Sequence, residues 1–462
     1  MGLKKNDCLT LKIEDLTNLG FGVAKADGQV VFVSDTVPGD EIIGKIIKVS
    51  SSFAVARVEK MLKSSPCRVD NRCAVSGCHS CAYKKISYAD ECAIKEESVR
   101  QIFKKCGLDE VKIEKIIPSP AERGYRNKAQ YPIARGRGGE YIIGFFAPKS
   151  HRVTEAADCP LAPEIFGEII ECLRGFFEKF ALSVYDEESG TGLLRHIYLR
   201  RGEVSGEVLL TLVINGSALP HAEELVRLIK ESFPSVVGIL LNFNKKSTNV
   251  ILGDEYAVLY GRDHIFDTLA GVRLKITAPS FYQVNHDCAE LLYRKARELS
   301  GLKESDTVLD LYCGAGSIGL SMAAKCREVI GIEIVESAVE CARFNAKENG
   351  ITNASFYTGD AKDTAKLLEG AEKIRGAKIS ADLVIFDPPR GGCDEALLLH
   401  VAKNLAPERI VYISCNPGTL ARDMVILKSA GYVGNSVTPV DMFPGTGHVE
   451  SVVCLKRQSD VI

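Results

Sequence analysis

Long hydrophobic runs are absent from this 462-residue sequence. No apolar stretch approaches the roughly 18 residues that a membrane-spanning helix requires, so none is predicted. The first residues, M-G-L-K-K-N-D, also lack the apolar core of a secretion signal. We therefore expect a cytoplasmic protein with no membrane partner.

A strong positive charge is missing as well, because the net charge is −2. Charge alone therefore does not predict a general affinity for nucleic acids. The charge is nevertheless uneven, since residues 61–160 hold 18 Lys and Arg against 12 Asp and Glu. A basic middle in an otherwise acidic chain fits a localised RNA-binding face.

Cysteine is abundant, with 16 residues. In a reducing compartment such residues indicate a metal site rather than disulfides. Cys78 and Cys81 form a C-x-x-C pair that can bind one centre, and Cys73 is close enough to add a third thiolate. The fourth ligand would be Cys67 or the distant Cys159. This spacing does not separate zinc from an iron–sulfur cluster.

The length predicts two to four domains, and we divide the chain at 1–62, 63–275 and 276–462. Short apolar runs separated by turns predict a small closed barrel of the OB type over the first segment. The stretches D-L-T-N-L-G-F-G-V-A, V-V-F-V and T-V-P-G-D resemble a TRAM domain. The resemblance implies RNA binding, and a barrel used only for docking is the alternative.

The second segment is predicted to be an α+β domain. Residues 123–152 interleave Arg and Lys with Tyr and Phe. Two interpretations stay open: a groove for single-stranded RNA, or a strand pair with one buried aromatic face. Arg195 and His196 lie either near a substrate or in a structural role.

From Asp306 onward, strands and helices alternate, which predicts an α/β fold with a doubly wound, mostly parallel sheet. Residues 314–319 read G-x-G-x-x-G, and Glu333 ends the next strand, where a carboxylate binds ribose hydroxyls. These features fit NAD or S-adenosylmethionine. Asp310 before the loop, Asp360 after the third strand and Asp387 in D-P-P-R favour S-adenosylmethionine.

A reactive thiol is predicted at Cys415, where the apolar strand of V-Y-I-S-C-N-P-G ends and a helix begins. Glu450 begins the last apolar strand, in G-T-G-H-V-E-S-V-V. A thiol and a carboxylate at strand edges of one sheet form a plausible nucleophile and base. The adjacent helix N-terminus is expected to lower the pKa of the thiol.

Five motifs together resemble the RNA uracil-C5 methyltransferases: F-Y-Q-V-N, L-D-L-Y-C-G-A-G, F-D-P-P-R-G-G, I-S-C-N-P and H-V-E-S-V-V. The TRAM-like start and the cysteines resemble the branch that methylates 23S rRNA and carries a [4Fe-4S] cluster. The resemblance implies a class I, Rossmann-like methyltransferase domain that binds S-adenosylmethionine. The implied donor-site residues are Gln283, Tyr312, Ser317, Glu333, Asp360 and Asp387. The implied cluster ligands are Cys73, Cys78, Cys81 and Cys159, with Cys415 as nucleophile and Glu450 as base.

The implied reaction converts uridine in 23S rRNA to 5-methyluridine, catalysed by a monomer. Attack of the Cys415 thiolate on C6 would make C5 nucleophilic, and Glu450 would remove the C5 proton after methyl transfer. Because C6 lies inside the stack, the base must flip out of the RNA. The alternatives are the same chemistry on tRNA, an amino-group methyltransferase, which D-P-P-R would also suit, and a non-enzymatic RNA-binding factor.

Two features depart from the family pattern. Four residues separate Cys73 from Cys78 where the family usually has five, so Cys67 is an alternative first ligand. The loop before Glu450 reads F-P-G-T-G-H, whereas relatives often have P-H-T-x-H. His448 is therefore the one histidine of this motif that remains in the loop.

Overall fold

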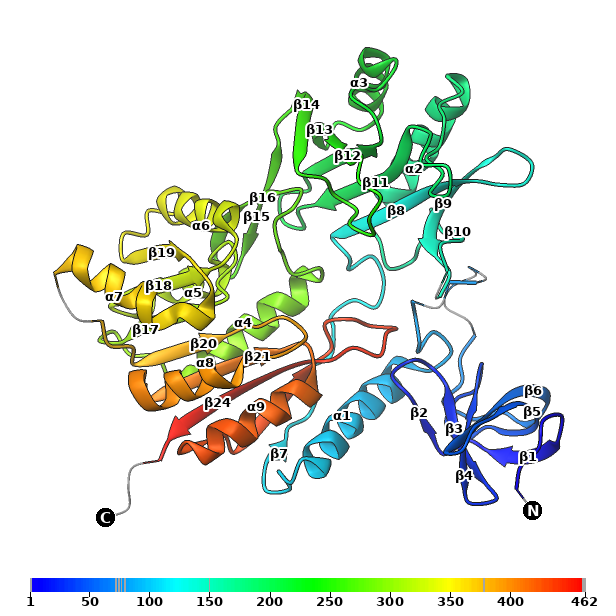
Figure 1. Ribbon diagram of the computed structural model, residues 1–462, viewed down its shortest axis with the longest axis horizontal. Helices are drawn as coiled ribbons and strands as arrows, with labels where there is room; N and C mark the ends of the chain where they lie inside the picture. The colour runs from blue at the N-terminus through cyan, green and yellow to red at the C-terminus, as the bar shows by residue number, and fades with distance from the viewer. Residues whose placement is uncertain are drawn as a thin grey trace.

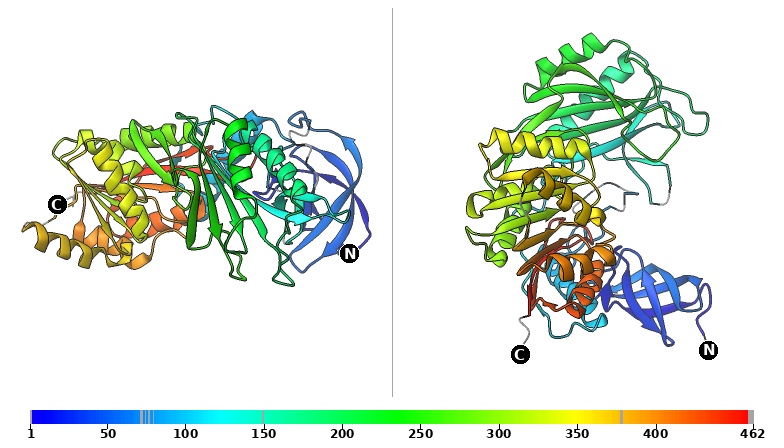
Figure 2. Two further views of the ribbon diagram at one scale, coloured as in Figure 1. Left: turned by 90° about the horizontal axis from the view of Figure 1, so that it is seen from above. Right: turned by 60° about the vertical axis from the view of Figure 1, so that its left-hand side comes forward.

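A computed structural model describes residues 2–70, 73, 75, 77–78, 80–148, 150–376 and 379–458. Three groups of elements are visible in Figure 1: N-terminal strands, a central sheet, and a C-terminal sheet with helices on both faces. The right-hand view of Figure 2 shows the N-terminal strands apart from the central sheet, with the C-terminal sheet to their left. Within the described ranges, no helix is long and apolar enough to cross a membrane.

The N-terminal unit is a six-stranded sheet in the order β1-β5-β6-β4-β3-β2. Its strands are β1 (Cys8–Lys12), β2 (Asp15–Leu16), β3 (Gly22–Ala26), β4 (Gln29–Val33), β5 (Glu41–Val49) and β6 (Phe53–Lys63). Strands β1 and β3 do not pair, yet they lie in contact, so the sheet curls around its small apolar core. Five apolar runs in the sequence indicate five strands, but the runs at 42–43 and 46–49 form the single strand β5, and β2 and β3 lie outside all five runs.

The segment after the cysteines packs against the C-terminal sheet. Helix α1 (Tyr88–Lys105) contacts α9 (Pro417–Ser429), and β7 (Lys112–Ile113) pairs in parallel with β23 (Ser436–Val440). The sequence assigns this segment to the central domain instead. The predicted boundaries at 62 and 275 fall inside strands β6 and β16. Met1 and residues 459–462, which the predicted domains include, lie outside the described residues. The three-domain division stays a prediction.

The central sheet has seven strands in the order β10-β9-β8-β11-β12-β13-β14. They are β8 (Lys128–Arg135), β9 (Tyr141–Phe146), β10 (Val153–Glu155), β11 (Leu194–Arg201), β12 (Val208–Ile214), β13 (Val236–Phe243) and β14 (Glu255–Gly261). Helices α2 (Glu164–Lys179) and α3 (Ala222–Ser232) cover one face and bury a common apolar core. This α+β arrangement agrees with the prediction.

The aromatic residues of 123–152 are mainly structural. Tyr125, Tyr131 and Tyr141 are at most 6% exposed, whereas Phe146 is 39% exposed. The guanidinium of Arg135 lies 3.7 Å from the centre of the Tyr141 ring. The interpretation as a strand pair with a buried aromatic face therefore holds for the tyrosines, and stacking on RNA is open to Phe146.

The hairpin of β15 (His264–Leu269) and β16 (Val272–Thr277) leads through α4 (His286–Ser300) into the C-terminal sheet. That sheet runs β19-β18-β17-β20-β21-β24-β23-β7. Its remaining strands are β17 (Thr307–Leu311), β18 (Glu328–Glu333), β19 (Ala354–Thr358), β20 (Leu383–Phe386), β21 (Arg409–Ser414), β22 (Tyr432–Val433) and β24 (Glu450–Arg457). Its helices include α5 (Ser317–Met322), α6 (Glu336–Glu348), α7 (Thr364–Arg375), α8 (Glu395–His400) and α9.

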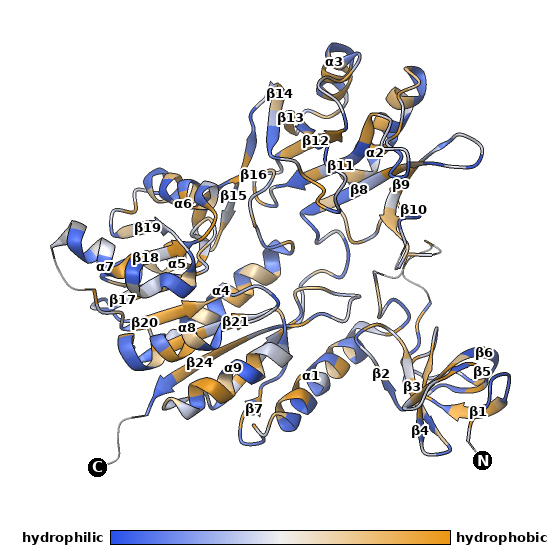
Figure 3. Cartoon of the chain, viewed as in Figure 1, coloured by the Kyte–Doolittle hydropathy of each residue, from blue (hydrophilic) through white to orange (hydrophobic). Residues whose placement is uncertain are grey.

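Strands β17 to β21 are parallel, and β24 runs antiparallel between β21 and β23. The five residues of β17 are all buried, as expected for a strand covered on both faces. Figure 3 shows hydrophobic residues along these strands and hydrophilic stretches on the flanking helices. Chain order reverses between β17 and β20, and the carboxyl ends of strands at such a point form a ligand-binding crevice.

Candidate functional site

The loop after β17 has a backbone suited to close approach by a ligand. Tyr312, Gly314 and Gly316 have φ angles of 67°, 54° and 81°. A Cβ on Gly316 would meet the Phe356 ring at 3.0 Å, so both sterics and φ require glycine there. Tyr312 adopts the left-handed region without being glycine, a strain that is concentrated at functional sites.

Two carboxylates hold this loop. Glu333, at the end of β18, accepts a hydrogen bond from the Gly314 backbone N–H at 3.1 Å. Asp310, fully buried in β17, accepts one from Gly319 N–H at 2.9 Å through Oδ2. Its Oδ1 is buried, and no hydrogen-bond partner for it lies among the described residues. Burial, with Asp387 and Glu333 nearby, raises the pKa of Asp310 to about 7.

Tyr293 of α4 connects several predicted site residues and was not found from the sequence. Its hydroxyl hydrogen bonds to Ser317 Oγ at 2.8 Å. Burial raises the pKa of its phenol, and the charges of Asp387, Asp310 and Glu450 raise it further. Tyr293 therefore lies near four groups from separate parts of the sheet edge. The 3.6-residue period marks it only as a core position of a helix.

Of the remaining predicted donor residues, Asp360 lies at the same edge, near Tyr312. Asp360 follows β19, and its side chain accepts a hydrogen bond from Lys362 N–H at 3.0 Å. Burial raises the pKa of Tyr312, and the Asp360 carboxylate adds to this effect, so the two lie near each other. Gln283 is buried, and Asn285 in the same motif donates to the Met442 carbonyl in the loop before β24.

Cys415 and Glu450 are neighbours across the sheet. Ser414 of β21 pairs with Ser451 of β24, so the antiparallel register sets Cys415 opposite Glu450. Opposed residues in such a pair have Cβ atoms about 4.5–5.5 Å apart. Asp387, which ends neighbouring β20, raises the pKa values of both groups through its charge. The nucleophile and base expected from the sequence therefore lie together.

The electrostatics of this cluster favour protonated groups. Burial, followed by the charge of Asp387, raises the pKa of Glu450 to about 8, and burial raises that of Asp387 to about 7. Burial, followed by the charges of Glu450 and Asp387, raises the pKa of Cys415 to about 11. Arg390, from D-P-P-R, opposes the shifts at Cys415 and Glu450.

The expectation that α9 lowers the pKa of Cys415 is therefore wrong for this structure. Pro417, the first residue of α9, has no N–H, and the Gly418 N–H donates to the Asn416 side chain at 3.0 Å. The helix thus has few free donors in its first turn, while two carboxylates act on the thiol.

The four cysteines predicted to bind a cluster line one cavity of about 270 Å³: Cys73, Cys78, Cys81 and Cys159. Burial, followed by the charge of Cys159, raises the pKa of Cys81 to about 12. Cys67 is elsewhere, because its Sγ lies 3.3 Å from the Pro38 carbonyl oxygen and contacts Ser65. Thr446, in the loop before β24, also lines the cavity.

The cavity does not by itself show a metal centre. In the part of the chain that the structure describes, no group of three or more His, Cys, Asp or Glu is arranged to hold a metal ion. The iron–sulfur cluster implied by the family resemblance is therefore not shown. Four thiols around one cavity nevertheless match the donor set that iron–sulfur clusters use.

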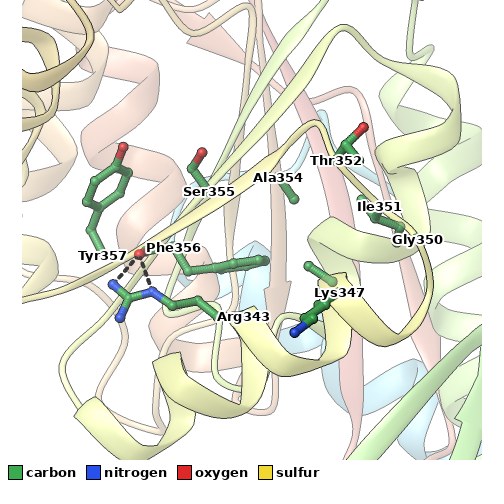
Figure 4. Close-up of a pocket in the computed structure, with 10 residues that line it drawn as sticks. Arg343, Lys347, Gly350, Ile351, Thr352, Ala354, Ser355, Phe356 and Tyr357 are labelled. Carbon is green, nitrogen blue, oxygen red and sulfur yellow. Dashed lines mark hydrogen bonds between the residues drawn. The ribbon is translucent and has the colours of Figure 1, made fainter.

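A separate hollow of about 500 Å³ lies between α6 and β19 (Figure 4). Arg343 on its wall donates to the Phe356 carbonyl at 2.7 and 3.1 Å, so its charge is engaged by the backbone. None of the predicted site residues lines this hollow.

The strand order, the glycine loop and the carboxylates at the strand ends define an S-adenosylmethionine-dependent methyltransferase fold. Residues 245–458 match the family described as tRNA (Uracil-5-)-methyltransferase, and residues 3–58 match the TRAM domain. An uncharacterized RNA methyltransferase of Halalkalibacterium halodurans is 39% identical over 459 residues, which cover 99% of this chain and 98% of that protein. One from Bacillus cereus is 40% identical and covers 98% of both chains. The chain belongs to the RNA uracil-C5 methyltransferase family.

A solved structure supports the same conclusion. The crystal structure of the Pyrococcus abyssi tRNA (uracil-54, C5)-methyltransferase with S-adenosyl-L-homocysteine superposes with a TM-score of 0.77. It is 29% identical and covers 96% of this chain and 99% of that chain. The expected family, the TRAM domain and the use of S-adenosylmethionine are thus confirmed. The RNA target, the roles of individual residues and the cluster stay predictions.

Proposed function

We propose that the protein transfers a methyl group from S-adenosylmethionine to C5 of a uridine in 23S rRNA. The observation that carries the chemistry is the register that sets Cys415 opposite Glu450 beside Asp387. A half-buried thiol and a buried carboxylate with a raised pKa are suited to covalent and general-base catalysis. The rRNA target follows from the TRAM domain combined with the cysteine-lined cavity.

The donor would be held at the reversal of strand order between β17 and β20. Gln283, Tyr312, Ser317, Glu333, Asp360 and Asp387 are the residues that we assign to it. Support comes from the left-handed backbone at Tyr312 and from the carboxylates at the ends of β18 and β20. When bound, S-adenosylmethionine supplies an electrophilic methyl group.

The reaction begins with addition of the Cys415 thiolate to C6, which places negative charge on C5 and O4 of the ring. C5 then takes the methyl group, and its remaining proton goes to the Glu450 carboxylate. Breaking the bond between the Cys415 sulfur and C6 restores the double bond and releases 5-methyluridine. Arg390 assists at both stages, because its charge favours the ionised forms of Cys415 and Glu450.

The pKa values of the two catalytic groups predict how the rate depends on pH. Glu450 must be ionised to accept the C5 proton, and its pKa is raised to about 8. The ionised fraction therefore grows as the pH rises through 8, and so should the rate. Cys415, with a pKa near 11, adds a further increase at higher pH.

Cys73, Cys78, Cys81 and Cys159 would hold a [4Fe-4S] cluster with a structural role. Such a cluster joins the cysteine loop to the segment before α2. The same cavity includes Thr446, and Tyr83 donates to the Gly445 carbonyl at 2.9 Å, so the cysteine loop supports the loop that leads to Glu450. The variant that tests this role is Cys78→Ser, which should lose iron and have a lower thermal-unfolding midpoint. The control is Cys106→Ser, at an exposed cysteine, which should change neither quantity.

The same chemistry on tRNA is the second candidate. It is favoured by the family description, which names tRNA, and by the likeness to the Pyrococcus abyssi tRNA enzyme. The catalytic residues would be unchanged, and only the RNA-binding surfaces would differ.

Nucleoside mass spectrometry on unmodified 23S rRNA and tRNA transcripts, each incubated with the protein and S-adenosylmethionine, separates the two. 5-Methyluridine in rRNA alone supports the proposal, and 5-methyluridine in tRNA alone transfers the chemistry to the second candidate. Neither product, from protein that binds the donor and retains its iron, would contradict the Cys415 and Glu450 mechanism. The Cys415→Ala protein is the blank for contaminating activity.

A further inference from the structure

A further cavity, of about 500 Å³, lies in the central sheet at the ends of β8, β9 and β11. Its lining includes Phe146, Tyr185, Arg195, His196 and the acidic residues 186–188. None of these residues has a role in methyl transfer, and none lines the cysteine cavity. The cavity therefore requires its own explanation.

His196 is the main polar group of this cavity. Its side chain is 8% exposed, yet no hydrogen-bond partner for Nδ1 or Nε2 lies within the described part of the chain. A buried polar group without a partner costs about 1–3 kcal/mol, so two on one ring indicate that a ligand supplies them. Burial, with the charge of Arg195, lowers the pKa of His196 to about 4. The neutral ring offers one donor and one acceptor.

A β-bulge in β11 sets the position of Arg195 next to His196. The pairing of β11 with β12 shifts register between Leu194 and His196, which makes Arg195 an extra residue in a bulge. Bulges redirect side chains and are over-represented next to active sites. Arg195 is fixed by donation from Nη1 to the carbonyls of Asn244 and Lys246, at 2.7 and 2.9 Å. Its guanidinium lies 4.2 Å from the centre of the Tyr185 ring.

The other lining groups indicate the chemistry of the ligand. Phe146 is 39% exposed; its ring meets His196 edge-on with centroids 6.4 Å apart and lies 5.9 Å from the His151 ring. Arg135 and Arg195 also line the cavity, but both donate to backbone carbonyls, and Glu187 pairs with His151. Asp186 and Glu188 add negative charge, so an amino-bearing group fits this lining better than a phosphate. Carboxylates accept hydrogen bonds from amino groups instead. An aromatic ring, a donor–acceptor imidazole and carboxylates together match a nucleobase that carries an exocyclic amino group.

We propose that this cavity, built around His196 and Phe146, holds an unstacked adenine, cytosine or guanine of the bound RNA, separate from the uridine that is methylated. The proposal rests on the proposed function only in taking RNA as the ligand. The extra base fixes the RNA on the central sheet while the target uridine reaches Cys415. RNA-binding proteins read single-stranded segments in this way, by stacking and by contacts to base edges.

The first test observes His196 directly in the full-length protein. Histidine labelled with ¹³C gives an imidazole Cε1–H signal, and the His196→Gln protein assigns it. We expect adenosine and cytidine monophosphates to shift this signal saturably, and uridine monophosphate or inorganic phosphate to need at least five times the concentration. No shift with either amino-bearing nucleotide, or an equal shift with uridine monophosphate or phosphate, would overturn the proposal.

The second test uses the exposed Phe146, whose replacement leaves the buried core intact. Phe146→Ala should weaken binding of a labelled 12-nucleotide single-stranded RNA of mixed sequence about tenfold, because stacking on an aromatic ring contributes roughly 1–3 kcal/mol per base. In methylation assays KM should rise by the same factor with kcat unchanged. The control His221→Asn alters an exposed histidine that stacks on Phe180 outside the cavity and should leave both unchanged. Unaltered RNA affinity of Phe146→Ala would contradict the proposal.

These readouts separate the two hypotheses. If the enzyme proved to make no 5-methyluridine, a saturable His196 response to adenosine monophosphate would still support the base pocket. If methylation occurred but His196 and Phe146 did not respond, the pocket alone would be rejected.

Discussion

One group of carboxylates lies between α1 and the C-terminal sheet and another lies at the strand ends of that sheet, and the two differ in how their charge is balanced. In the first, Lys95 of α1 donates to Glu91 at 2.8 Å and to Asp441 at 2.6 Å, with all three side chains at most 1% exposed. In the second, Asp310, Asp387 and Glu450 lie near one another, and among the described residues none of them forms an ion pair with Lys or Arg.

The difference separates a structural group from a reactive one. Lys95 also donates to the Phe443 carbonyl, and Glu91 accepts from Gly445 N–H at 2.6 Å, so this group fixes α1 to the loop before Glu450. Among the described residues the second group has no buried cation, and its pKa values rise towards neutrality instead. Proton transfer near pH 7 needs such values. Each prediction below alters a member of one of the two groups or a residue whose charge or thiol is coupled to the second.

The largest effect is expected from Cys415→Ala. Removing the nucleophile should lower the rate of 5-methyluridine formation by roughly 10⁴-fold or more. The thermal-unfolding midpoint and the affinity for S-adenosylmethionine should stay unchanged, because Cys415 is assigned no donor contact. Substantial remaining activity on the same RNA would favour a mechanism without covalent addition.

The next largest effect is expected from Glu450→Gln, which should lower the rate of 5-methyluridine formation by about 10²–10⁴-fold. The amide keeps the shape of the side chain but cannot take the C5 proton, so the bond from Cys415 to C6 should persist after methyl transfer. A protein–RNA adduct that resists denaturing gel electrophoresis is therefore expected. It should be absent from the Cys415→Ala/Glu450→Gln double variant. A turnover rate close to that of the native enzyme would assign proton removal to another group.

Lys95→Met tests the structural group. Two carboxylates would remain buried without their cation, which should destabilise the protein by about 3–5 kcal/mol. Urea unfolding followed by circular dichroism measures this. Lys428→Met is the matched control, because its partner Glu110 and Lys428 itself are about half exposed, and the loss should stay within about 1 kcal/mol. Equal unfolding midpoints for the two variants would show that the Lys95 group does not support the fold.

Much of the reactive group can be predicted from the sequence, because strand ends are local features. Apolar runs end just before Asp387 and at Cys415, and another begins at Glu450, so the sequence shows where each strand edge lies. Parallel strands β20 and β21 and antiparallel β24 bring these edges together. The cysteine cavity follows in the same way from close spacing. The wrong expectation concerned the pKa of Cys415, because that value depends on burial and on carboxylates at the ends of two other strands.

The structural group could not be predicted. Lys95 and Asp441 are 346 positions apart, and the helical pattern of α1 does not reveal which sheet it joins. For the same reason the sequence does not show that α1 and β7 pack against the C-terminal sheet. That the His196 ring nitrogens have no hydrogen-bond partner among the described residues is likewise a property of the packed structure, since the sequence left Arg195 and His196 undecided between two roles.

The smallest effect is expected from Arg390→Gln, which removes the nearest positive charge from the reactive group. Arg390 lowers the pKa values of Cys415 and Glu450 against the effect of burial, so its loss should raise both. The ionised fraction of Glu450 at pH 7.5 then falls, and the rising part of the pH–rate profile moves to higher pH. Single-turnover rates between pH 6.5 and 9.5 measure this shift, and Arg390→Lys should restore most of it because the charge is kept. A uniform decrease in rate at every pH, with the profile unmoved, would mean that Arg390 acts by contacting RNA and not through the ionisation of the two catalytic groups.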